Sequence, residues 1–223
     1  MDRNAVAQVG LTARDLPPLT PESIRAPELA RVDPRGWFEH ADRPFEIEIG
    51  SGKGTFLVQQ ARLQPETNFL GIEYAGEYYR HATDRVARHH LLNVRTLYGD
   101  GLDFLMSRCP DSIAAVIHLY FPDPWPKKRH HKRRMVQDPF LAAAHRVLVP
   151  SGELRVVTDH PDYWGWMERY FGEWCATGRH ARFERCPFER PPSAREGECV
   201  GTNFERKYIA EGRQFHAAML RRA

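Results

Sequence analysis

The amino-acid sequence predicts an α/β fold in which helices cover both faces of an open, mostly parallel β-sheet. From Pro44 onward, apolar runs of strand length alternate with helical patterns of about 10–15 residues. The run Ile113–Phe121 is almost continuously apolar, as is typical of a strand at the centre of a parallel sheet. The glycine-rich segment Gly50–Gly54 follows the first apolar run, at a point where such sheets often bind a ligand. Together these features favour a doubly wound sheet.

The expected elements follow from this alternation. Each expected strand is an apolar run bounded by glycine or polar residues: Phe45–Ile49, Asn68–Tyr74, Val94–Tyr98, Ile113–Phe121 and Gly152–Thr158. The expected helices are Gly54–Leu63, Gly76–His90, Pro139–Val147 and Pro161–Cys175. Two further strands, separated by a long irregular segment, are expected between about Ala181 and Arg222.

The beginning of the chain differs from the rest. Residues 1–36 contain five prolines and show no sustained apolar period, which predicts a flexible or loosely docked arm. Residues 37–223 would then form one α/β domain, and a chain of 223 residues is long enough for both parts. The sequence leaves the oligomeric state open between a monomer and a homodimer.

Composition narrows the class of protein. A hydrophobic content of 42% with a mean hydropathy of −0.58 favours a packed core. No apolar run approaches the roughly 18 residues that span a bilayer, and the N-terminus lacks the apolar region of a signal peptide. We therefore expect a cytoplasmic protein without membrane association. The four cysteines lie far apart and the histidines show no ligand spacing, so we expect neither disulfides nor a bound metal.

Positive charge is concentrated in one segment. Residues 127–134 carry six formal positive charges, whereas the rest of the chain has 26 basic and 29 acidic residues. One basic patch on a mildly acidic body indicates a polyanionic partner at one place. We expect the cations Lys128, Arg129, Lys132, Arg133 and Arg134 to contact a phosphate backbone. His130 and His131 are expected to form hydrogen bonds there.

Three ligand classes compete for the loop Gly50–Gly54, whose glycines Gly50, Gly52 and Gly54 let backbone N–H groups approach a ligand. A phosphate-binding P-loop needs a glycine where Ile47 stands and a Ser or Thr where Gly54 stands. A dinucleotide fingerprint needs a glycine or alanine where Thr55 stands. S-adenosyl-L-methionine carries a cationic amine and sulfonium, so the acid Glu48 beside the loop would favour it. The third ligand fits best.

Two more acids follow strands that should end at the same edge of the sheet. Glu73 ends the second strand, where a carboxylate can accept hydrogen bonds from two ribose hydroxyls. Asp100 follows the third strand, where it could accept from an adenine amino group. Glu48, Glu73 and Asp100 should therefore face one crevice, which is typical of a nucleoside-containing cofactor.

The segment Phe121–Pro126 follows the central strand and contains three prolines, so the backbone around Asp123 should be rigid. Asp123 could accept from N–H groups of a flat base, and Trp125 could either stack on that base or lie in the core. Asp159 follows the fifth strand at the same edge. The segment Thr202–Lys207 precedes the final strand and, by pattern alone, could be an ordinary amphipathic turn.

Four segments resemble the motifs of one enzyme family: Ile47–Gly54, Gly71–Glu73, Phe121–Arg134 and Thr202–Glu205. They are similar to those of the tRNA (guanine-N7)-methyltransferase family of the bacterial TrmB type, over about Phe45 to the C-terminus. The resemblance implies a class I (Rossmann-like) methyltransferase fold, a seven-stranded, mostly parallel sheet whose last strand is antiparallel. It implies S-adenosyl-L-methionine as cofactor, and formation of 7-methylguanosine at position 46 in the variable loop of tRNA.

The resemblance also implies roles for individual residues. Glu48, Glu73, Asp100 and Asp123 would bind the cofactor, and Asp123 would also take part in the chemistry. The substrate would be bound by residues that match the family's motifs: Lys127, Asp159, Thr202, Asn203, Phe204 and Glu205. Guanine N7 carries a lone pair and no proton, so the reaction needs alignment more than a general base.

Two other functions stay compatible with the residues alone. Pro122–Trp125 resembles the acid, proline and aromatic loop of adenine-N6 enzymes, which methylate an amino group of a base. A non-catalytic RNA-binding module would keep the basic segment, but it would not need Glu48, Glu73, Asp100 and the complete glycine loop. The product nucleoside distinguishes the first alternative, and cofactor binding distinguishes the second.

Overall fold

A computed structural model describes residues 9–176 and 182–223. Its centre is an eight-stranded sheet with the order β1-β4-β3-β2-β5-β6-β8-β7. The strands are β1 (Gly10–Leu11), β2 (Phe45–Ile49), β3 (Asn68–Glu73), β4 (Val94–Tyr98), β5 (Ala114–Tyr120), β6 (Leu148–Thr158), β7 (Phe183–Cys186) and β8 (His216–Arg222). Only β8 runs against its neighbours, since β6 and β7 both pair with it in antiparallel register. The expected mostly parallel sheet with an antiparallel last strand is confirmed.

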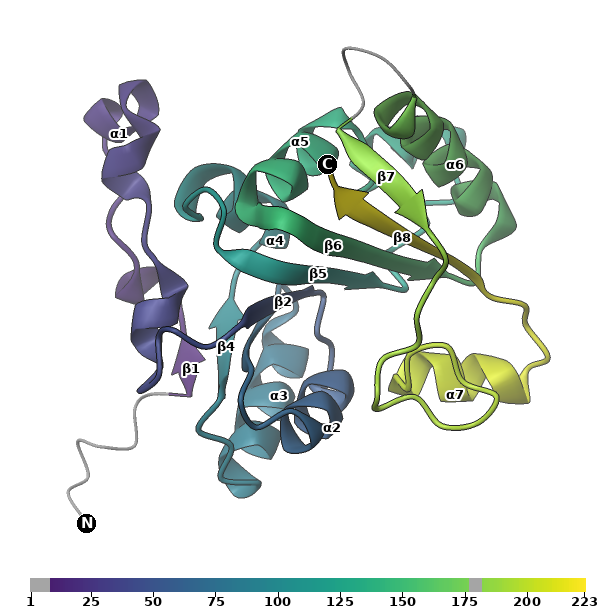
Figure 1. The fold of residues 1–223 in the computed structure, drawn as a ribbon, viewed down its shortest axis with the longest axis horizontal. Helices are drawn as coiled ribbons and strands as arrows, with labels where there is room; N and C mark the ends of the chain where they lie inside the picture. The colour runs from purple at the N-terminus through teal and green to yellow at the C-terminus, as the bar shows by residue number, and fades with distance from the viewer. Residues whose placement is uncertain (1–8, 177–181) are drawn as a thin grey trace.

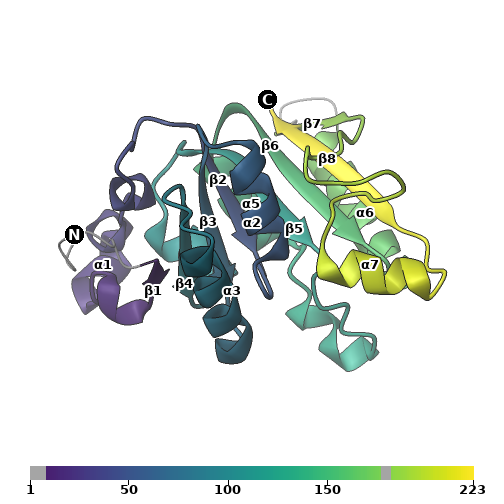
Figure 2. The ribbon, with the colours of Figure 1, turned by 90° about the horizontal axis from the view of Figure 1, so that it is seen from below.

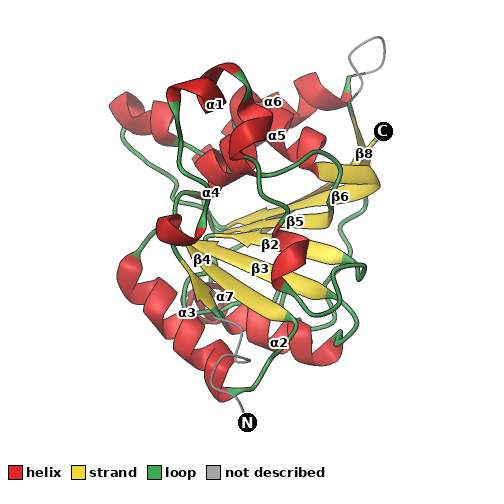
Figure 3. Ribbon diagram, turned by 90° about the vertical axis from the view of Figure 1, so that its left-hand side faces the viewer, coloured by secondary structure: helices red, strands yellow, loops and turns green. Residues whose placement is uncertain are grey.

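Helices cover both faces of the sheet, as Figure 3 shows. One face carries α2 (Thr55–Leu63), α3 (Gly76–Arg88) and α7 (Asn203–Ala210). The other carries α1 (Pro21–Arg25), α4 (Gly101–Asp103), α5 (Asp138–Val147) and α6 (Pro161–Cys175). The shorter helical turns are η1 (Ala13–Asp15), η2 (Pro27–Ala30), η3 (Pro34–Trp37), the π-helical η4 (Phe104–Arg108) and η5 (Lys128–Arg133). In the described residues, no helix has both the length and the apolar character needed to cross a bilayer.

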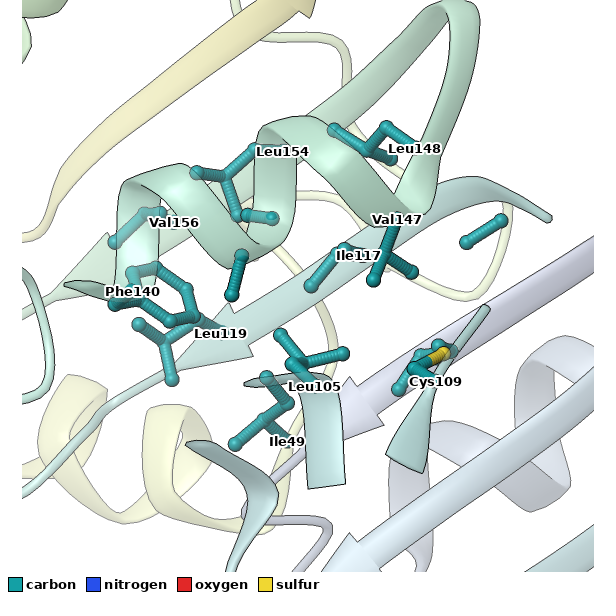
Figure 4. Packing of buried hydrophobic residues seen from close by; sticks show 14 of the residues in the cluster. Ile49, Leu105, Cys109, Ile117, Leu119, Phe140, Val147, Leu148, Leu154 and Val156 are labelled. Carbon is teal, nitrogen blue, oxygen red and sulfur yellow. The ribbon is translucent and has the colours of Figure 1, made fainter. Parts of the chain in front are cut away.

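The main core lies between β5, β6 and helix α5. Ile117 and Leu119 of β5 point toward Phe140 of α5, and all three are almost completely buried (Figure 4). The alternate residues His118 and Tyr120 face α2 and are buried as well. Both faces of β5 are therefore covered, which explains why its sequence is nearly continuous in apolar residues.

The expected count of seven strands is wrong because the N-terminal segment supplies an eighth. β1 pairs in parallel with β4 at the sheet edge, and Figure 1 shows the segment of α1 beyond it. Leu11 and Ala30 are buried, and the backbone N–H of Val32 donates to the carbonyl of Arg108 at 2.8 Å. Residues 9–36 therefore pack on the domain. Residues 1–8 of the expected arm lie outside the described residues, and the division of the chain at residue 36 stays a prediction.

The C-terminal part contains an element that the sequence did not reveal. The segment between the last two strands was expected to be irregular, but it includes helix α7. Thr202 begins this helix, since its hydroxyl accepts from the backbone N–H of Glu205 at 3.1 Å. The segment Thr202–Lys207 is thus a helix start, and it packs on the side of the sheet that carries α2.

Candidate active site

The loop after β2 requires glycine for steric reasons. Gly50, Gly52 and Gly54 have φ angles of 74°, 55° and 68°, a left-handed conformation that costs other residues about 1–2 kcal/mol. A Cβ atom on Gly54 would also lie 3.0 Å from the Cβ of Ala82, because α2 packs closely on α3 there. Glycine is therefore needed in this loop for two reasons: the turn has left-handed φ angles, and at Gly54 the helices α2 and α3 pack too closely for a side chain.

Glu73 holds this loop through its carboxylate. One oxygen, Oε2, accepts the backbone N–H of Gly52 at 2.8 Å, and Oε1 accepts the N–H of Ala75 at 2.7 Å. The side chain ends β3 and is buried. The acid at this strand end thus fixes the glycine loop after β2 and the start of α3 at the same time.

Glu48 is a buried acid with an unused oxygen. The residue is only 4% exposed, and its Oε2 has no hydrogen-bond partner among the described residues. Burial, together with the charge of Glu73, raises the pKa of the Glu48 carboxyl well above its usual range. The Ser51 hydroxyl, whose residue lines the same cavity as Glu48, is likewise buried without a partner in the described chain. Unpaired buried polar atoms are costly, and a cationic, hydrogen-bonding ligand would satisfy them.

Asp100 begins the short helix α4. Its Oδ1 accepts the backbone N–H groups of Leu102 and Asp103 at 2.8 and 3.0 Å. The residue is exposed, and it lines the same cavity as Glu73. The sequence placed Asp100 correctly at this edge of the sheet, and the capping role was not foreseen.

Two adjoining cavities lie over the carboxyl ends of the strands. The larger, of about 440 Å³, is lined by Glu73, Asp100, Asp123, Trp125 and Arg133 among others. The smaller, of about 210 Å³, is lined by Glu48, Lys53, Thr202, Asn203 and Lys207 among others. Residues common to both walls join them into one site: Gly50, Gly52, Tyr78, Tyr120, Phe121 and Phe204.

The loop after β5 has a constrained backbone. Phe121 and Trp125 have φ angles of 53° and 44°, which are uncommon for residues other than glycine. The Phe121 ring packs edge-on against Phe215, with 5.6 Å between centroids. Asp123 lies between these two positions, is exposed, and borders the larger cavity. The structure thus presents the Asp123 carboxylate at the cavity.

Trp125 is half-buried and forms part of the cavity wall. The guanidinium of Arg133 lies 4.9 Å from its ring centre, and the His130 ring packs edge-on at 5.8 Å. Trp125 therefore lies between the cavity and the basic segment, outside the main core, and stacking on a base stays a prediction.

The basic segment forms the short helix η5 and projects beyond the ends of the strands, below β5 in Figure 2. Most of its cations are exposed: Lys127, Lys128, Arg129, Lys132 and Arg133. Arg134 differs, because its side chain is only 1% exposed and bonds to Asp162 and to the Pro124 carbonyl. In this structure Arg134 is not placed to contact a phosphate, because its guanidinium is directed into the protein.

Two expected substrate residues also face the protein. The carboxylate of Glu205 is fully buried and accepts the backbone N–H groups of Val200 and Gly201 at 3.0 and 2.7 Å. Asp159 pairs with Arg213 at 2.5 Å. Neither residue is among those that line the two cavities, whereas Thr202, Asn203 and Phe204 are. In this structure Glu205 organises the loop before α7.

Several lining residues were not identified from the sequence. Tyr120 borders both cavities, and its hydroxyl is 2.7 Å from Nδ1 of His118, whose Nε2 is 2.8 Å from the Glu46 carboxylate. Tyr120 could have been identified from the sequence, because it ends strand β5 at the edge of the sheet where the acids lie. Tyr78 lies inside helix α3, and Phe56 inside α2, where no local signal distinguishes a cavity residue from a core residue.

The sheet order, the glycine loop and the acids at successive strand ends define a class I methyltransferase fold. The solved structure of the aminoglycoside resistance methyltransferase NpmB1 is similar, with a TM-score of 0.54 at 18% identity, covering 96% of this chain and 98% of that one. This likeness concerns the fold. A family model described as "Putative methyltransferase" matches residues 42–218.

The chain belongs to the tRNA (guanine-N7)-methyltransferase family, which confirms the resemblance seen in its motifs. A tRNA (guanine-N(7)-)-methyltransferase of Halorhodospira halophila is 34% identical over 202 residues, covering 89% of this chain and 83% of the relative. The enzyme of the same name from Magnetococcus marinus is 36% identical over 211 residues, covering 95% and 79%. That from Corynebacterium diphtheriae is 33% identical over 190 residues, covering 85% and 71%.

Proposed function

We propose that this chain transfers a methyl group from S-adenosyl-L-methionine to N7 of the guanine at position 46 in the variable loop of tRNA. The product would be 7-methylguanosine. One observation carries the proposal: acids from successive strand ends and Asp123 border one site, next to an exposed basic segment. The names of the relatives support the same reaction. A tRNA substrate would place this reaction in the cytoplasm.

The residues of the site fit S-adenosyl-L-methionine. Glu48 offers a buried and unpaired carboxylate oxygen, which suits the cationic amino end of the ligand. Glu73 and Asp100 border the larger cavity. The backbone N–H groups of Leu102 and Asp103 both donate to Oδ1 of Asp100, so its Oδ2 is available for a ligand. When bound, the cofactor supplies a methyl group attached to a positively charged sulfur. The glycine loop and these acids would hold it.

Asp123 would act on the target base. Guanine N7 has an in-plane lone pair, so no side chain has to remove a proton from it. The base becomes positively charged as the methyl arrives, and a carboxylate nearby stabilises that charge. Asp123 borders the cavity, and the packing of Phe121 on Phe215 and the bond from Arg134 to the Pro124 carbonyl hold its loop, so it would orient the base as well.

The exposed cations of the basic segment would bind the tRNA backbone. Lys128, Arg129 and Lys132 are exposed and belong to η5, whose Arg133 lines the larger cavity. Each neutralised phosphate releases counterions, so binding should weaken as salt concentration rises. These contacts would place the variable loop over Asp123.

The proposal is tested with a labelled methyl group from S-adenosyl-L-methionine and an unmodified tRNA transcript, followed by digestion and identification of the labelled nucleoside. A matched transcript carries adenosine in place of the guanosine at position 46. We expect label in 7-methylguanosine, and its loss with that one substitution. Label in N6-methyladenosine, or in both transcripts equally, would contradict the proposal.

A further inference from the structure

Arg134 ends the basic segment but does not share its environment. Its side chain is 1% exposed, whereas the neighbouring Arg133 and Lys132 are exposed. An arginine charge is rarely buried unless its donors are paired, because removal from water is costly. The contacts that retain this charge inside the protein therefore indicate its role.

The guanidinium of Arg134 joins a loop to a helix. Its Nε donates to the carbonyl of Pro124 at 2.9 Å, and its Nη2 donates to the carboxylate of Asp162 on α6. The planar group also lies 5.0 Å from the ring centre of Tyr163 and 5.2 Å from that of Trp166, both on α6. Hydrogen bonds and aromatic stacking together fix its position.

The Pro124 carbonyl lies in the peptide bond between Pro124 and Trp125, directly after Asp123. Arg134 is 10 residues further along the chain, so this hydrogen bond closes the loop that contains the exposed cations. Helix α6 is itself fixed to the core at this point, because its Tyr163 is completely buried. The Tyr163 hydroxyl accepts the backbone N–H of Val136 at 3.1 Å. The Arg134 side chain thus attaches the loop that presents Asp123 to helix α6.

We propose that Arg134 is a positioning residue for the methyl transfer: it holds the loop Pro122–Arg134 on helix α6 and thereby fixes Asp123 at the cavity. This inference rests on the proposed function for its effect on turnover. Its effect on the loop itself does not depend on which substrate is methylated. The role differs from phosphate binding, which needs an exposed cation.

The alternative is a buried ion pair that stabilises the fold and nothing else. The two roles are separated by Arg134→Lys, which keeps the charge but loses the planar fork. Arg95→Lys is the matched control, since Arg95 is also buried, stacks on the Phe38 ring at 5.0 Å and donates to the Leu92 and Val94 carbonyls. Arg95 is not among the residues that line the two cavities.

Hydrogen exchange by mass spectrometry on the ligand-free variants measures the loop directly. For Arg134→Lys we expect faster exchange confined to peptides spanning residues 122–137, because the loop opens more often. We expect kcat on the tRNA transcript to fall by about 10- to 100-fold, since small displacements of a positioned group have effects of this size. The KM for tRNA and the slope of binding against salt should stay within experimental error. Arg95→Lys should show neither the local exchange nor the loss of kcat.

A second variant covers the case in which Arg134→Lys does not fold. Asp162 is 61% exposed at its side chain, so Asp162→Asn should fold, and it should reproduce the local exchange to a smaller degree. Exchange that rises equally over the whole chain, with kcat unchanged relative to Arg95→Lys, would make Arg134 a merely structural residue. In Arg134→Gln, which removes the charge, a slope of tRNA binding against salt lower by about one, as expected for Arg129→Gln, would restore the phosphate contact and overturn the proposal. Absence of 7-methylguanosine with the wild-type protein would contradict the proposed function alone, because the exchange result stands without it.

Discussion

The two sides of the site are held by different kinds of contact. On the cofactor side, the Glu73 carboxylate binds the backbone N–H groups of Gly52 and Ala75, and the loop conformation depends on glycine. On the target-base side, the loop around Asp123 is fastened by side chains: Phe121 packs on Phe215, and Arg134 reaches back to the Pro124 carbonyl. The cofactor side is fixed by backbone N–H groups bonded to one buried carboxylate, and the target-base side by a few side chains.

This difference predicts how substitutions on the two sides should act. Changes in the glycine loop or in Glu48 should alter stability and cofactor affinity, because Glu48, Gly50 and Gly52 line the smaller cavity. Changes around Asp123 should alter turnover while cofactor affinity is largely kept, since that loop carries few of the buried contacts.

The largest effect is expected at Asp123. Asp123→Asn keeps the shape of the side chain and removes its charge, so the positive charge that develops on guanine loses its partner. We expect kcat to fall about 100-fold or more, by analogy with the loss of one electrostatic contact in other active sites. The dissociation constant for S-adenosyl-L-methionine, measured by calorimetry, should change only a few-fold. Wild-type turnover in this variant would remove Asp123 from the mechanism.

An intermediate effect is expected in the glycine loop, where two positions can be compared. Both Gly50 and Gly54 have a left-handed φ, but an added Cβ meets nothing within 4 Å at Gly50 and meets Ala82 at 3.0 Å at Gly54. Gly54→Ala should therefore be less stable than Gly50→Ala by about 1–3 kcal/mol, the usual cost of overpacking. Urea unfolding of both variants measures the difference. Equal stabilities would show that the helices yield without cost.

The smallest effect is expected at Glu48. Glu48→Gln should weaken S-adenosyl-L-methionine binding by about tenfold, the loss typical of one hydrogen bond to a charged group. The same change should make the ligand-free protein more stable at alkaline pH, because it removes a buried carboxylate beside Glu73. Calorimetric titration measures the affinity. A variant that binds as tightly as wild type would exclude Glu48 from the cofactor contact.

The sign of the pH effect follows from the raised pKa of Glu48. The folded protein retains this proton to higher pH than the unfolded chain, whose carboxyl has a pKa near 4.5. Stability from the protonated form is fully present below about pH 4.5 and is lost as pH rises through the folded pKa. The melting temperature of Glu48→Gln should therefore exceed that of wild type at about pH 8.5 and approach it at about pH 4.5. A constant difference across this range would contradict the assignment.

The sequence was most informative where the geometry is local. The glycine loop, Glu73 and Asp100 follow from the order of strand, turn and helix, so their meeting at one sheet edge was predictable. Arg134 could not be predicted, because its burial depends on Asp162 and Trp166, which lie about 30 residues further along the chain. As part of a basic run, it is indistinguishable from its exposed neighbours.

The C-terminal residues show the same limit. Glu205 and Asp159 were assigned to substrate by family motif, but the carboxylate of Glu205 is bonded to Val200 and Gly201, and that of Asp159 to Arg213. A motif gives the identity of a residue at a position, and the direction of its side chain depends on packing. The two-residue strand β1 likewise forms only because it pairs with β4. Two residues are too few to show the alternating hydrophobic pattern that predicts a strand.

In the proposed reaction the lone pair of guanine N7 receives the methyl group with no proton removed, whereas an alternative reaction would use another atom of the base. A tRNA with 7-deazaguanosine at position 46 separates the two, because this base keeps the Watson–Crick hydrogen-bonding groups of guanine but has a C–H group in place of N7. We expect this tRNA to bind with the affinity of the guanosine form and to accept no labelled methyl group. Methyl transfer to the 7-deazaguanosine tRNA at the normal rate would show that N7 is not the methyl acceptor.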